Sequence, residues 1–400
     1  MSEQILGFLN EFGEKILGIF SSFSDMSADD NFAVLKMVIM CAIGGLLIYL
    51  AIAKDMEPTL LLPMGFGTIL VNLPLAFTDG VLKPGEGAID ILYNAGVANE
   101  LFPLLLFIGI GAMIDFGPVL SNPKLMIFGA AAQFGIFFTL FAASFFFPLN
   151  EAASIAIIGA ADGPTSIFVA TELGSKYIGA IIVAAYSYMA LVPIVQPPVI
   201  KLLTTKKERK IRMKYEGKSV SKRTRILFPI IVSVIAGIIA PQSAVLIGFL
   251  MFGNLIRECG VLDSLSETAQ KVLANLVTIL LGITVAANMN AKDFLRVETA
   301  LILGLGLVAF IVDTAGGVIF AKILNIFLPE GKKFNPMIGA AGISAFPMSS
   351  RVVHKLGLEA DNQNFLLMHA TGVNVSGQVA SVIAGGVVLK FALEWLGGAV

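Results

Sequence analysis

Charged side chains are scarce in this sequence. Of its 400 residues only 14% are Asp, Glu, Lys or Arg, whereas 56% are hydrophobic and the mean hydropathy is +0.87. Because a soluble domain carries about 25% charged residues, the composition excludes a soluble fold and indicates an integral membrane protein. The net charge of −1 gives no reason to expect nucleic acid as a partner.

Cysteine and basic residues are missing where other classes of protein need them. Cys41 and Cys259 are the two cysteines, and both lie in or beside apolar stretches. They supply neither a disulfide framework nor the spacing of a metal site, so we interpret them as packing residues. The N-terminus lacks the basic region of a signal peptide, since its first basic residue is Lys15.

Apolar residues at the N-terminus recur at helical spacing over residues 3–21. This pattern predicts an amphipathic helix that lies on the membrane or on a neighbouring protein. A partly frayed chain end is the alternative interpretation of the same pattern.

Long apolar runs fill most of the remaining chain. A helix needs about 20 apolar residues to span a bilayer, and on that measure we predict about eleven crossing elements. The stretch 226–256 is too long for one crossing and contains Pro241, so we expect a break there. The predicted elements are residues 33–53, 59–77, 101–115, 124–147, 153–171, 177–200, 226–256, 271–289, 298–325, 337–354 and 364–394.

The basic residues gather in one segment, residues 201–225. This segment holds eleven of the 27 Lys and Arg residues and only two acidic ones, Glu208 and Glu216. The positive-inside rule therefore predicts a cytoplasmic loop, and this explanation removes the need for a nucleic-acid partner. Residues 78–100 are Gly-rich and net acidic, which favours the outer side.

Two similar segments stand on either side of the basic loop. IGAADGPTSIFVATELG (158–174) and IGAAGISAFPMSSRVVHKLG (338–357) both begin Ile-Gly-Ala-Ala, contain a Pro near hydroxyl residues, and end Leu-Gly. A weaker pair precedes them, GIGAMIDFGPVL from residue 109 and GITVAANMNAKDFL from residue 282. Paired, interrupted apolar segments are typical of transporters whose binding site lies between two repeats.

We therefore predict an all-α polytopic membrane protein of two pseudo-symmetric, inverted repeats, each with a broken helix. The expected organisation is an amphipathic segment at 1–30, a first membrane repeat at 31–200, the basic loop at 201–225 and a second membrane repeat at 226–400.

The first broken segment has the chemistry of a small-cation site. Unwound backbone exposes carbonyl oxygens, and Asp162, Thr165 and Ser166 add hard oxygen ligands, for which Na+ is the natural candidate. A charged Asp at membrane depth costs at least ~2.5 kcal/mol, so Asp162 is expected to be paired with a cation or protonated. A helix cap is the alternative role for Asp162, and the two roles are compatible.

The second broken segment has no acid. Asn335, Ser344, Ser349 and Ser350 offer neutral oxygens, and Arg351 follows them. A guanidinium there either meets an anionic ligand or reaches the interface by snorkelling; both interpretations stay open.

Five further residues are weaker candidates. One of Tyr186 and Tyr188 is expected to face the cavity, because a phenol inside a span needs a hydroxyl partner. His369 and Asp313 are possible lining residues at membrane depth, whereas Asp115 lies near a span end and can reach water.

Four stretches together resemble a known family. They are IGAADGPTSIF from residue 158, LLIYLAIAKDMEPTLLLPMGFG from 46, AAYSYMALVPIVQPPVIK from 184 and GISAFPMSSR from 342. They are similar to the membrane-embedded beta subunit of the biotin-dependent, sodium-pumping decarboxylases, the group that contains oxaloacetate, methylmalonyl-CoA and glutaconyl-CoA decarboxylases. The resemblance covers the chain from about residue 33 to the end.

The resemblance implies a subunit of the bacterial inner membrane that receives carboxybiotin from a separate carrier subunit, releases CO2, takes up a proton and expels Na+. It implies three partners, namely a carboxyltransferase subunit, the biotin carrier subunit and a small membrane subunit, and a homo-oligomer within the complex. Catalytic roles fall on Asp162, Tyr188, Ser344 and Arg351, and Arg351 would also face the carboxybiotin. With the oxygens named above, the expected Na+ ligands are Asp162, Thr165, Asn335, Gly339, Ser344 and Asn374.

A second class of function fits the same broken repeats. A Na+-coupled secondary carboxylate carrier or a Na+/H+ antiporter needs them but has no enzymatic partners, so binding to a biotin-carrying protein separates the two classes. The chain has no biotin-lysine context and no soluble carboxyltransferase domain, so we expect the acyl substrate to be chosen on another subunit.

Overall fold

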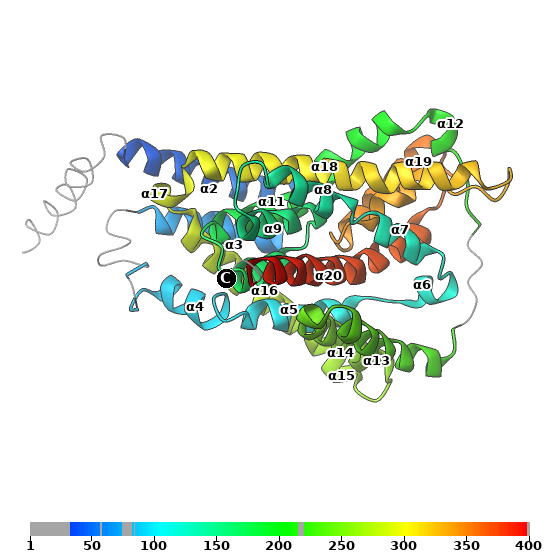
Figure 1. Ribbon diagram of the computed structural model, residues 1–400, viewed down its shortest axis with the longest axis horizontal. Coiled ribbons are helices and arrows are strands. Elements are labelled where there is room, and N and C mark those ends of the chain that lie inside the picture. Colours follow the sequence, from blue (N-terminus) through cyan, green and yellow to red (C-terminus); the bar gives the residue numbers. More distant parts are fainter. Residues whose placement is uncertain (1–32, 57, 74–81, 84, 215–219, 398–400) are drawn as a thin grey trace, which may run out of the picture. The chain divides into compact units, whose positions relative to one another are not determined.

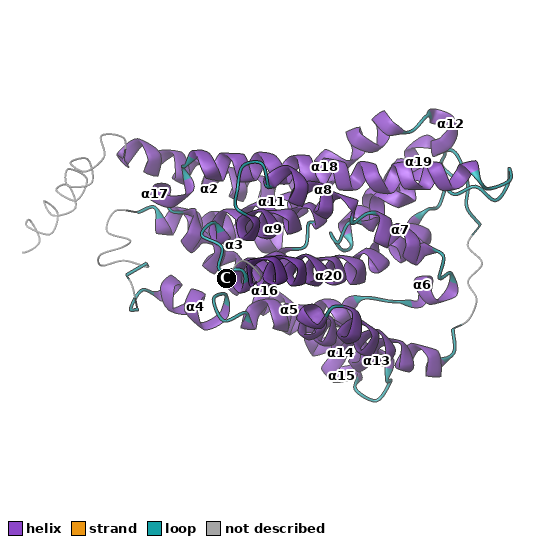
Figure 2. Cartoon of the chain, viewed as in Figure 1, coloured by secondary structure: helices purple, strands orange, loops and turns teal. Residues whose placement is uncertain are grey.

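The computed structural model describes residues 33–56, 58–73, 82–83, 85–214 and 220–397. Every regular element within these residues is a helix, and none of them forms a strand (Figure 2). The all-α prediction is therefore confirmed for the described chain. The amphipathic helix predicted over residues 3–21 lies outside the described residues.

Several helices are long and apolar enough to cross a bilayer. Within the described residues there are six, and a seventh is possible if the pair Ala88–Gly96 and Leu101–Met113, bent by 64°, counts as one span. The six are Val34–Lys54, Leu125–Ala143, Ile178–Leu203, Asp263–Met289, Val297–Ile326 and Leu367–Gly397. Our other predicted crossings are shorter or interrupted helices, so the total of eleven stays a prediction.

Contacts within the chain divide it into two compact units, and most of the α-helices are labelled in Figure 1. Unit 1 consists of Met1–Ala95 and Ile279–Thr299, and unit 2 of Gly96–Thr278 and Ala300–Val400. This division does not follow the boundary that we predicted at the basic loop. Compactness does not test a sequence repeat, however, so the two inverted repeats stay a prediction.

Unit 1 is built on a close helix pair. Its elements are α2 (Ala33–Lys54), α3 (Pro58–Val71), most of α4 (Ala88–Gly96), the end of α16 (Ala274–Val285), η4 (Ala286–Met289) and α17 (Ala291–Phe294). A Cβ on Gly65 would lie 2.7 Å from the carbonyl oxygen of Gly44, so these glycines let α2 and α3 approach closely. Asn72 joins the two stretches of unit 1, since its amide donates to the Met289 carbonyl at 2.8 Å and accepts from the Ala291 N–H at 2.7 Å.

Unit 2 is organised around its last helix, α20 (Leu367–Gly397), drawn in red in Figure 1. This helix packs against α6, α7, α9, α10, α14, α19, η2 and η5. The unit also contains α5 (Leu101–Met113), α6 (Gly117–Ser121), α7 (Leu125–Ala131), α8 (Phe134–Ala143), α9 (Leu149–Ala156), η1 (Ile157–Ala160), α10 (Gly163–Glu172), α11 (Ile178–Leu203), α12 (Lys206–Arg209), α13 (Lys222–Ile239), η2 (Pro241–Ser243), α14 (Ala244–Glu258), α15 (Asp263–Glu267), η3 (Thr268–Leu273), the start of α16, most of α18 (Val297–Ile326), η5 (Pro336–Gly342) and α19 (Met348–Ala360).

The predicted break at Pro241 is confirmed. Helix α13 ends at Ile239, one 3₁₀ turn begins at Pro241, and α14 follows from Ala244. Apolar side chains along α13 remain exposed, among them Ile230, Ile231, Val234 and Ile238. A continuous exposed apolar face of this kind suits contact with lipid rather than water.

Candidate functional site

The first broken segment interrupts the chain between α9 and α10. After the 3₁₀ turn η1, Ala161 adopts a left-handed conformation (φ 51°) and Asp162 an extended one, and α10 begins at Gly163. A non-Gly residue with positive φ is uncommon and strained. Asp162 caps the new helix by accepting the Thr165 N–H at 3.3 Å, and it is 4% exposed. The predicted break and the capping role of Asp162 are both confirmed.

The second broken segment has the same order of elements. The 3₁₀ helix η5 ends at Gly342, Ile343 is extended, and α19 begins at Met348. The two breaks are in direct contact, because the backbone N–H of Ser344 donates to the carbonyl of Ala160 at 3.0 Å. Segments about 180 residues apart in sequence therefore form one region of unit 2.

Helix α20 binds both breaks with one face. The amide of Asn374 donates to the Ile343 carbonyl at 2.8 Å, and the amide of Gln378 donates to the Ser344 carbonyl. One turn further on, the hydroxyl of Ser381 donates to Asp162 Oδ2 at 2.8 Å. The spacing i, i+4, i+7 puts these three polar side chains on one side of the helix.

Most backbone carbonyls at the breaks already accept hydrogen bonds. The carbonyls of Ala340 and Gly342 accept from the amides of Gln196 (2.7 Å) and Gln133 (3.2 Å), and that of Asp162 accepts from Ser166 Oγ (2.8 Å). We expected freed carbonyls, but a buried unpaired carbonyl is costly, and neighbouring side chains satisfy these groups instead.

Side-chain oxygens are the acceptors that remain available. Among the buried oxygens around the breaks that have no hydrogen-bond partner in the described residues are Thr165 Oγ1, Ser344 Oγ, Asn374 Oδ1 and the Tyr186 hydroxyl. Thr165, Ser344 and Asn374, together with the Asp162 carboxylate, supply hard oxygens of the kind that a small cation prefers. Three of the predicted Na+ ligands besides Asp162 thus lie on the connected breaks and on α20.

The two tyrosines of α11 point to different neighbours. A Cβ on Gly163 would lie 2.4 Å from the ring of Tyr186, so Tyr186 packs on the Asp162 turn. The hydroxyl of Tyr188 instead donates to the Leu303 carbonyl of α18. Two residues along a helix turn by about 200°, so one of the pair had to face away. Our assignment of Tyr188 as a catalytic residue stays a prediction.

Gly339 lies within η5, and Asn335 caps the start of η5. The backbone of Gly339 packs on α18, where a Cβ would lie 2.0 Å from the Gly317 carbonyl. The carboxamide of Asn335 accepts the Met337 N–H at 3.1 Å and donates to the carbonyls of Arg209 (3.0 Å) and Ile211 (2.9 Å). These contacts join the second break to the basic segment, and the ligand roles predicted for both residues remain untested.

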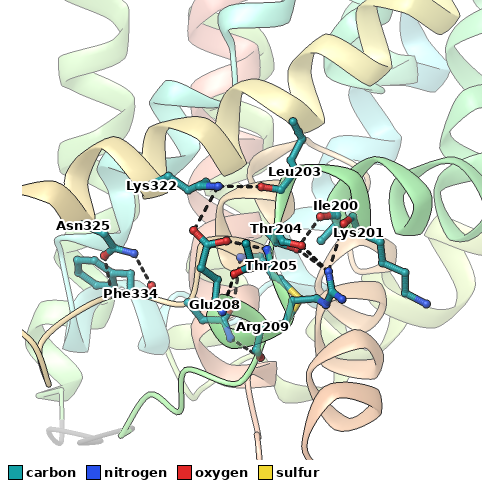
Figure 3. Close-up of polar contacts among 12 residues, drawn as sticks. Ile200, Lys201, Leu203, Thr204, Thr205, Glu208, Arg209, Lys322, Asn325 and Phe334 are labelled. Atoms are coloured by element: carbon teal, nitrogen blue, oxygen red, sulfur yellow. Dashed lines mark hydrogen bonds and ion pairs between the residues drawn. The ribbon is translucent and has the colours of Figure 1, made fainter.

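The basic segment folds into a compact turn beside α18 (Figure 3). Thr205 and Glu208 form a capping box at the start of α12. The ammonium of Lys322 donates to the Leu203 carbonyl at 3.0 Å and pairs with Glu208 at 3.2 Å. Burial raises the pKa of Glu208, but hydrogen bonds from Thr205 and Lys322 outweigh it and hold this pKa below its usual value.

A cavity of about 840 Å³ opens beside this turn. Its lining combines basic and acidic side chains with the isoleucines of α18, and includes Lys207, Arg212, Ile319, Lys322, Glu330 and Lys333. Arg351, at the start of α19, is exposed, and its guanidinium has no ion pair among the described residues. Positive groups are therefore available outside the buried site.

Four polar residues that complete the region were not predicted. They are Gln133 between α7 and α8, Gln196 on α11, and Gln378 and Ser381 on α20. Of the two tyrosines, one of which was expected to face the cavity, Tyr186 is the one that packs on the Asp162 turn. The polar spacing from Asn374 through Gln378 to Ser381 was visible within an otherwise apolar stretch and is the signal that would have found the α20 residues.

The fold and the site define a class. The chain is a multi-pass, all-helical membrane protein in which two broken segments and a long helix enclose a buried carboxylate. The family described as "Na+-transporting oxaloacetate decarboxylase beta subunit" matches residues 36–392. The chain belongs to that family, as a component of a Na+-translocating decarboxylase in the bacterial inner membrane.

Curated relatives agree with this assignment over nearly their whole length. The methylmalonyl-CoA decarboxylase subunit beta of Propionigenium modestum is 48% identical over 376 residues, covering 88% of this chain and 94% of the relative. The oxaloacetate decarboxylase beta chain of Klebsiella pneumoniae is 46% identical over 413 residues, covering 89% and 95%. The methylmalonyl-CoA decarboxylase subunit beta of Veillonella parvula is 49% identical over 353 residues, covering 88% and 92%.

Proposed function

We propose that this chain decarboxylates carboxybiotin and uses the reaction to drive Na+ outward across the membrane. Two hydrogen bonds carry the proposal. Asp162, in the first broken segment, accepts from the Ser381 hydroxyl of α20, and the Ala160 carbonyl of the same segment accepts from the Ser344 N–H of the second broken segment. A buried carboxylate at such a junction is suited to bind Na+ and H+ in alternation, because either cation offsets the cost of its charge.

The chemical step needs an anion contact and a proton. In carboxybiotin decarboxylation the N–C bond breaks, CO2 leaves, and the electron pair stays on the ureido nitrogen, which then takes a proton. Removing the carboxylate from water favours the loss of CO2. Arg351 would orient that carboxylate, since a guanidinium pairs with carboxylates in a fixed geometry. Asp162 and Tyr188 are the proposed members of the proton path, with Ser344 beside the reacting group.

Na+ transport must be strictly coupled to decarboxylation. Moving one Na+ against ~100 mV requires ~2.3 kcal/mol before any concentration gradient. We propose that Na+ displaces a proton from Asp162, a rigid-body movement of the site-bearing helices exposes the ion to the outside, and an incoming proton releases it. Thr165, Ser344 and Asn374 would complete the Na+ shell, with Asn335 and Gly339 shaping the second break.

The proposal includes a topology and a set of partners. The basic segment 201–225 would lie in the cytoplasm, in a protein of about eleven crossings and two inverted repeats. Its partners would be a carboxyltransferase subunit, a biotin carrier subunit and a small membrane subunit, in a homo-oligomer. The cavity beside α12 and the exposed Arg351 support a contact with the carrier on that side.

The test is CO2 release from a carboxybiotin-loaded carrier protein by membranes that contain this chain, with and without Na+. Wild-type membranes should need Na+, and Asp162→Asn should abolish the release. Asp115→Asn is the matched control, because Asp115 is half-buried at the end of α5 and caps the local Gly117 N–H at 2.8 Å; it should retain Na+-dependent release.

The rival function gives a different result in the same membranes. A Na+-coupled carboxylate carrier or a Na+/H+ antiporter would move Na+ or a carboxylate but release no CO2 from the carrier protein. Na+ movement without release, in wild type, would overturn the decarboxylation proposal.

A further inference from the structure

One face of α18 lies behind both broken segments. A Cβ on Gly159 of the first break would meet the Ala309 side chain at 3.2 Å, and a Cβ on Gly317 would lie 2.1 Å from the carbonyl of Gly339 in the second break. Ala309, Asp313 and Gly317 are spaced i, i+4, i+8 and therefore share one side of the helix. Asp313 is the residue between the two contact points.

Asp313 is a carboxylic acid in the middle of a span. Helix α18 runs for 30 residues, Val297–Ile326, and places Asp313 near its centre with 0% of the residue exposed. Oδ1 accepts the Gly135 N–H at 2.7 Å, but Oδ2 has no hydrogen-bond partner among the described residues. An ionised carboxylate at this depth is costly unless a cation neutralises it.

The partner of Asp313 lies at the start of α8. A turn at Ala132 and Gln133 interrupts the span Leu125–Ala143 between α7 and α8, and Gly135 belongs to the first turn of α8, where N–H groups lack intrahelical partners. Asp162 likewise accepts an N–H from the first turn of a helix, its own helix α10. A structural cap explains the contact of Oδ1, but it leaves the buried Oδ2 unexplained.

Gly135 also connects the two acids. Its carbonyl group lies 3.4 Å from the position of a Cβ on Gly159, three residues before Asp162. A change at the Asp313–Gly135 bond would therefore act directly on the backbone of the first break. Of the elements around this part of α18, α8, η1 and η5 contain no titratable side chain, and α11 brings Tyr188, bonded to Leu303.

We propose that Asp313 is a second proton-binding carboxyl of the pump, and that it exchanges its proton in step with Na+ binding at the Asp162 site. In the exchange the O–H bond at Oδ2 breaks, the electron pair stays on the carboxylate, and the proton leaves to water on the side to which the region is then open. This inference rests on the proposed Na+ and H+ exchange, and it assigns to α18 a role in proton movement.

The substitution Asp313→Asn distinguishes a proton-binding role of Asp313 from a purely structural role as a helix cap. Asparagine keeps an oxygen that can accept the Gly135 N–H but carries no exchangeable carboxyl proton, so a cap survives the substitution and a proton-binding role does not. Glu151→Gln is the control variant: Glu151 is also a buried acid, but its oxygens are bonded to the Ser175 hydroxyl (2.5 Å) and the Lys176 N–H (3.0 Å).

The experiment is infrared difference spectroscopy of the full chain in lipid, recorded on exchanging K+ for Na+, with aspartate labelled by ¹³C. We expect a protonated-aspartate carbonyl band that changes with Na+, survives in Glu151→Gln and disappears in Asp313→Asn. In the reconstituted complex, Asp313→Asn should lower the rate of Na+ uptake about tenfold or more.

Three results would overturn the inference: a band that persists unchanged in Asp313→Asn, the absence of any Na+-sensitive protonated-aspartate band, or an Asp313→Asn complex with wild-type Na+ uptake. If Asp313→Asn fails to fold, Asp313→Glu provides the measurement: because only aspartate is labelled, the Na+-sensitive carbonyl band must lose its ¹³C shift in this variant, and a band that keeps the shift would overturn the inference. A chain with the Asp313 band that releases no CO2 from carboxybiotin would leave this inference standing and overturn the proposed function.

Discussion

The two broken segments of unit 2 are held in place in opposite ways. The first break is stabilised by its own acid, because Asp162 caps α10 and accepts a hydrogen bond from the Ser381 hydroxyl. At the second break the segment has no acid, and amide side chains from its neighbours hold its carbonyls. The amides belong to Gln133, Gln196, Asn374 and Gln378.

The first break therefore carries the buried charge, and the second break is an uncharged scaffold. An acid in each break would add a second desolvation cost, whereas here one charged break is paired with a neutral break that has the same order of elements. The neutral break can then supply oxygens such as Ser344 Oγ without adding charge. The predictions below test this division, from the largest effect to the smallest.

Removing the charge of the first break should have the largest effect. Asp162→Asn keeps one oxygen that can accept the Thr165 N–H, and its NH2 group can donate to the Ser381 hydroxyl oxygen, but it cannot alternate between Na+ and H+. We expect Na+-dependent transport by the reconstituted complex to fall at least ~100-fold, with a thermal midpoint close to that of wild type. Substantial Na+ transport by this variant would show that the first break does not depend on its charge.

Crowding the scaffold behind the second break should reduce stability. In Gly317→Ala the new methyl would lie 2.1 Å from the Gly339 carbonyl, and overpacking of this kind costs about 1–3 kcal/mol. Gly304→Ala, on the same helix, has nothing within 4 Å of its Cβ and should be neutral or slightly stabilising. Thermal unfolding in one detergent compares the pair, and equal midpoints would contradict the close approach.

Two neighbouring positions on α20 should separate stability from ion binding. Gln378→Leu leaves the buried Ser344 carbonyl without its donor and should cost about 1–3 kcal/mol of stability. Ser381→Ala removes a hydrogen bond to the Asp162 carboxylate and should cost less, about 1 kcal/mol, while changing the Na+ concentration for half-maximal activity. A larger loss of stability in Ser381→Ala than in Gln378→Leu would reverse the comparison.

The phenol beside the first break should have a smaller effect on Na+. Tyr186→Phe removes a buried hydroxyl that has no partner among the described residues, so folding should be nearly unaffected. A change of about threefold in the Na+ requirement, or ~0.7 kcal/mol, would place that hydroxyl at the ion. An unchanged Na+ titration would leave Tyr186 as a packing residue of the Asp162 turn.

The weakest effect is expected in the basic segment, which Asn335 joins to the second break. The pKa of Glu208 is depressed below its ordinary 4.5 in the folded protein, so its contribution to stability is present above pH 4.5 and is lost as the pH falls through the folded value. Because the Lys322 pair is partly exposed, this loss should be under about 1 kcal/mol. Glu208→Gln should flatten that part of the pH–stability curve, and an unaltered curve would show that the turn is held by other contacts.

The sequence predicted local features well because their causes are local. The Asp-Gly-Pro run at 162–164 is both a helix cap and a helix start, and Pro241 has no N–H for the helix that precedes it, so the interruptions at Asp162 and at Pro241 were predictable. The directions in which side chains point within the fold could not be predicted from the sequence. Tyr186 and Tyr188 are equivalent in the sequence, and only the packing of Gly163 and α18 distinguishes them.

Long-range partners explain the other differences. The bond between Asp313 and Gly135 joins residues 178 positions apart, and the amide of Asn335 reaches the basic segment over 124 to 126 positions. No periodicity or motif encodes such distances. The polar face of α20 was visible as a spacing, but its meaning depended on knowing that both breaks lie against it.

The bond between Ser344 and Ala160 has a consequence for how this protein can change over time. Donor and acceptor are both main-chain atoms, so side-chain substitutions at either position leave the link in place, and only a proline at 344 would delete its donor. The side chains of the two broken segments can therefore change independently while this backbone hydrogen bond keeps the segments joined. Such a bond permits one broken segment to carry an acid, Asp162, while the other carries none.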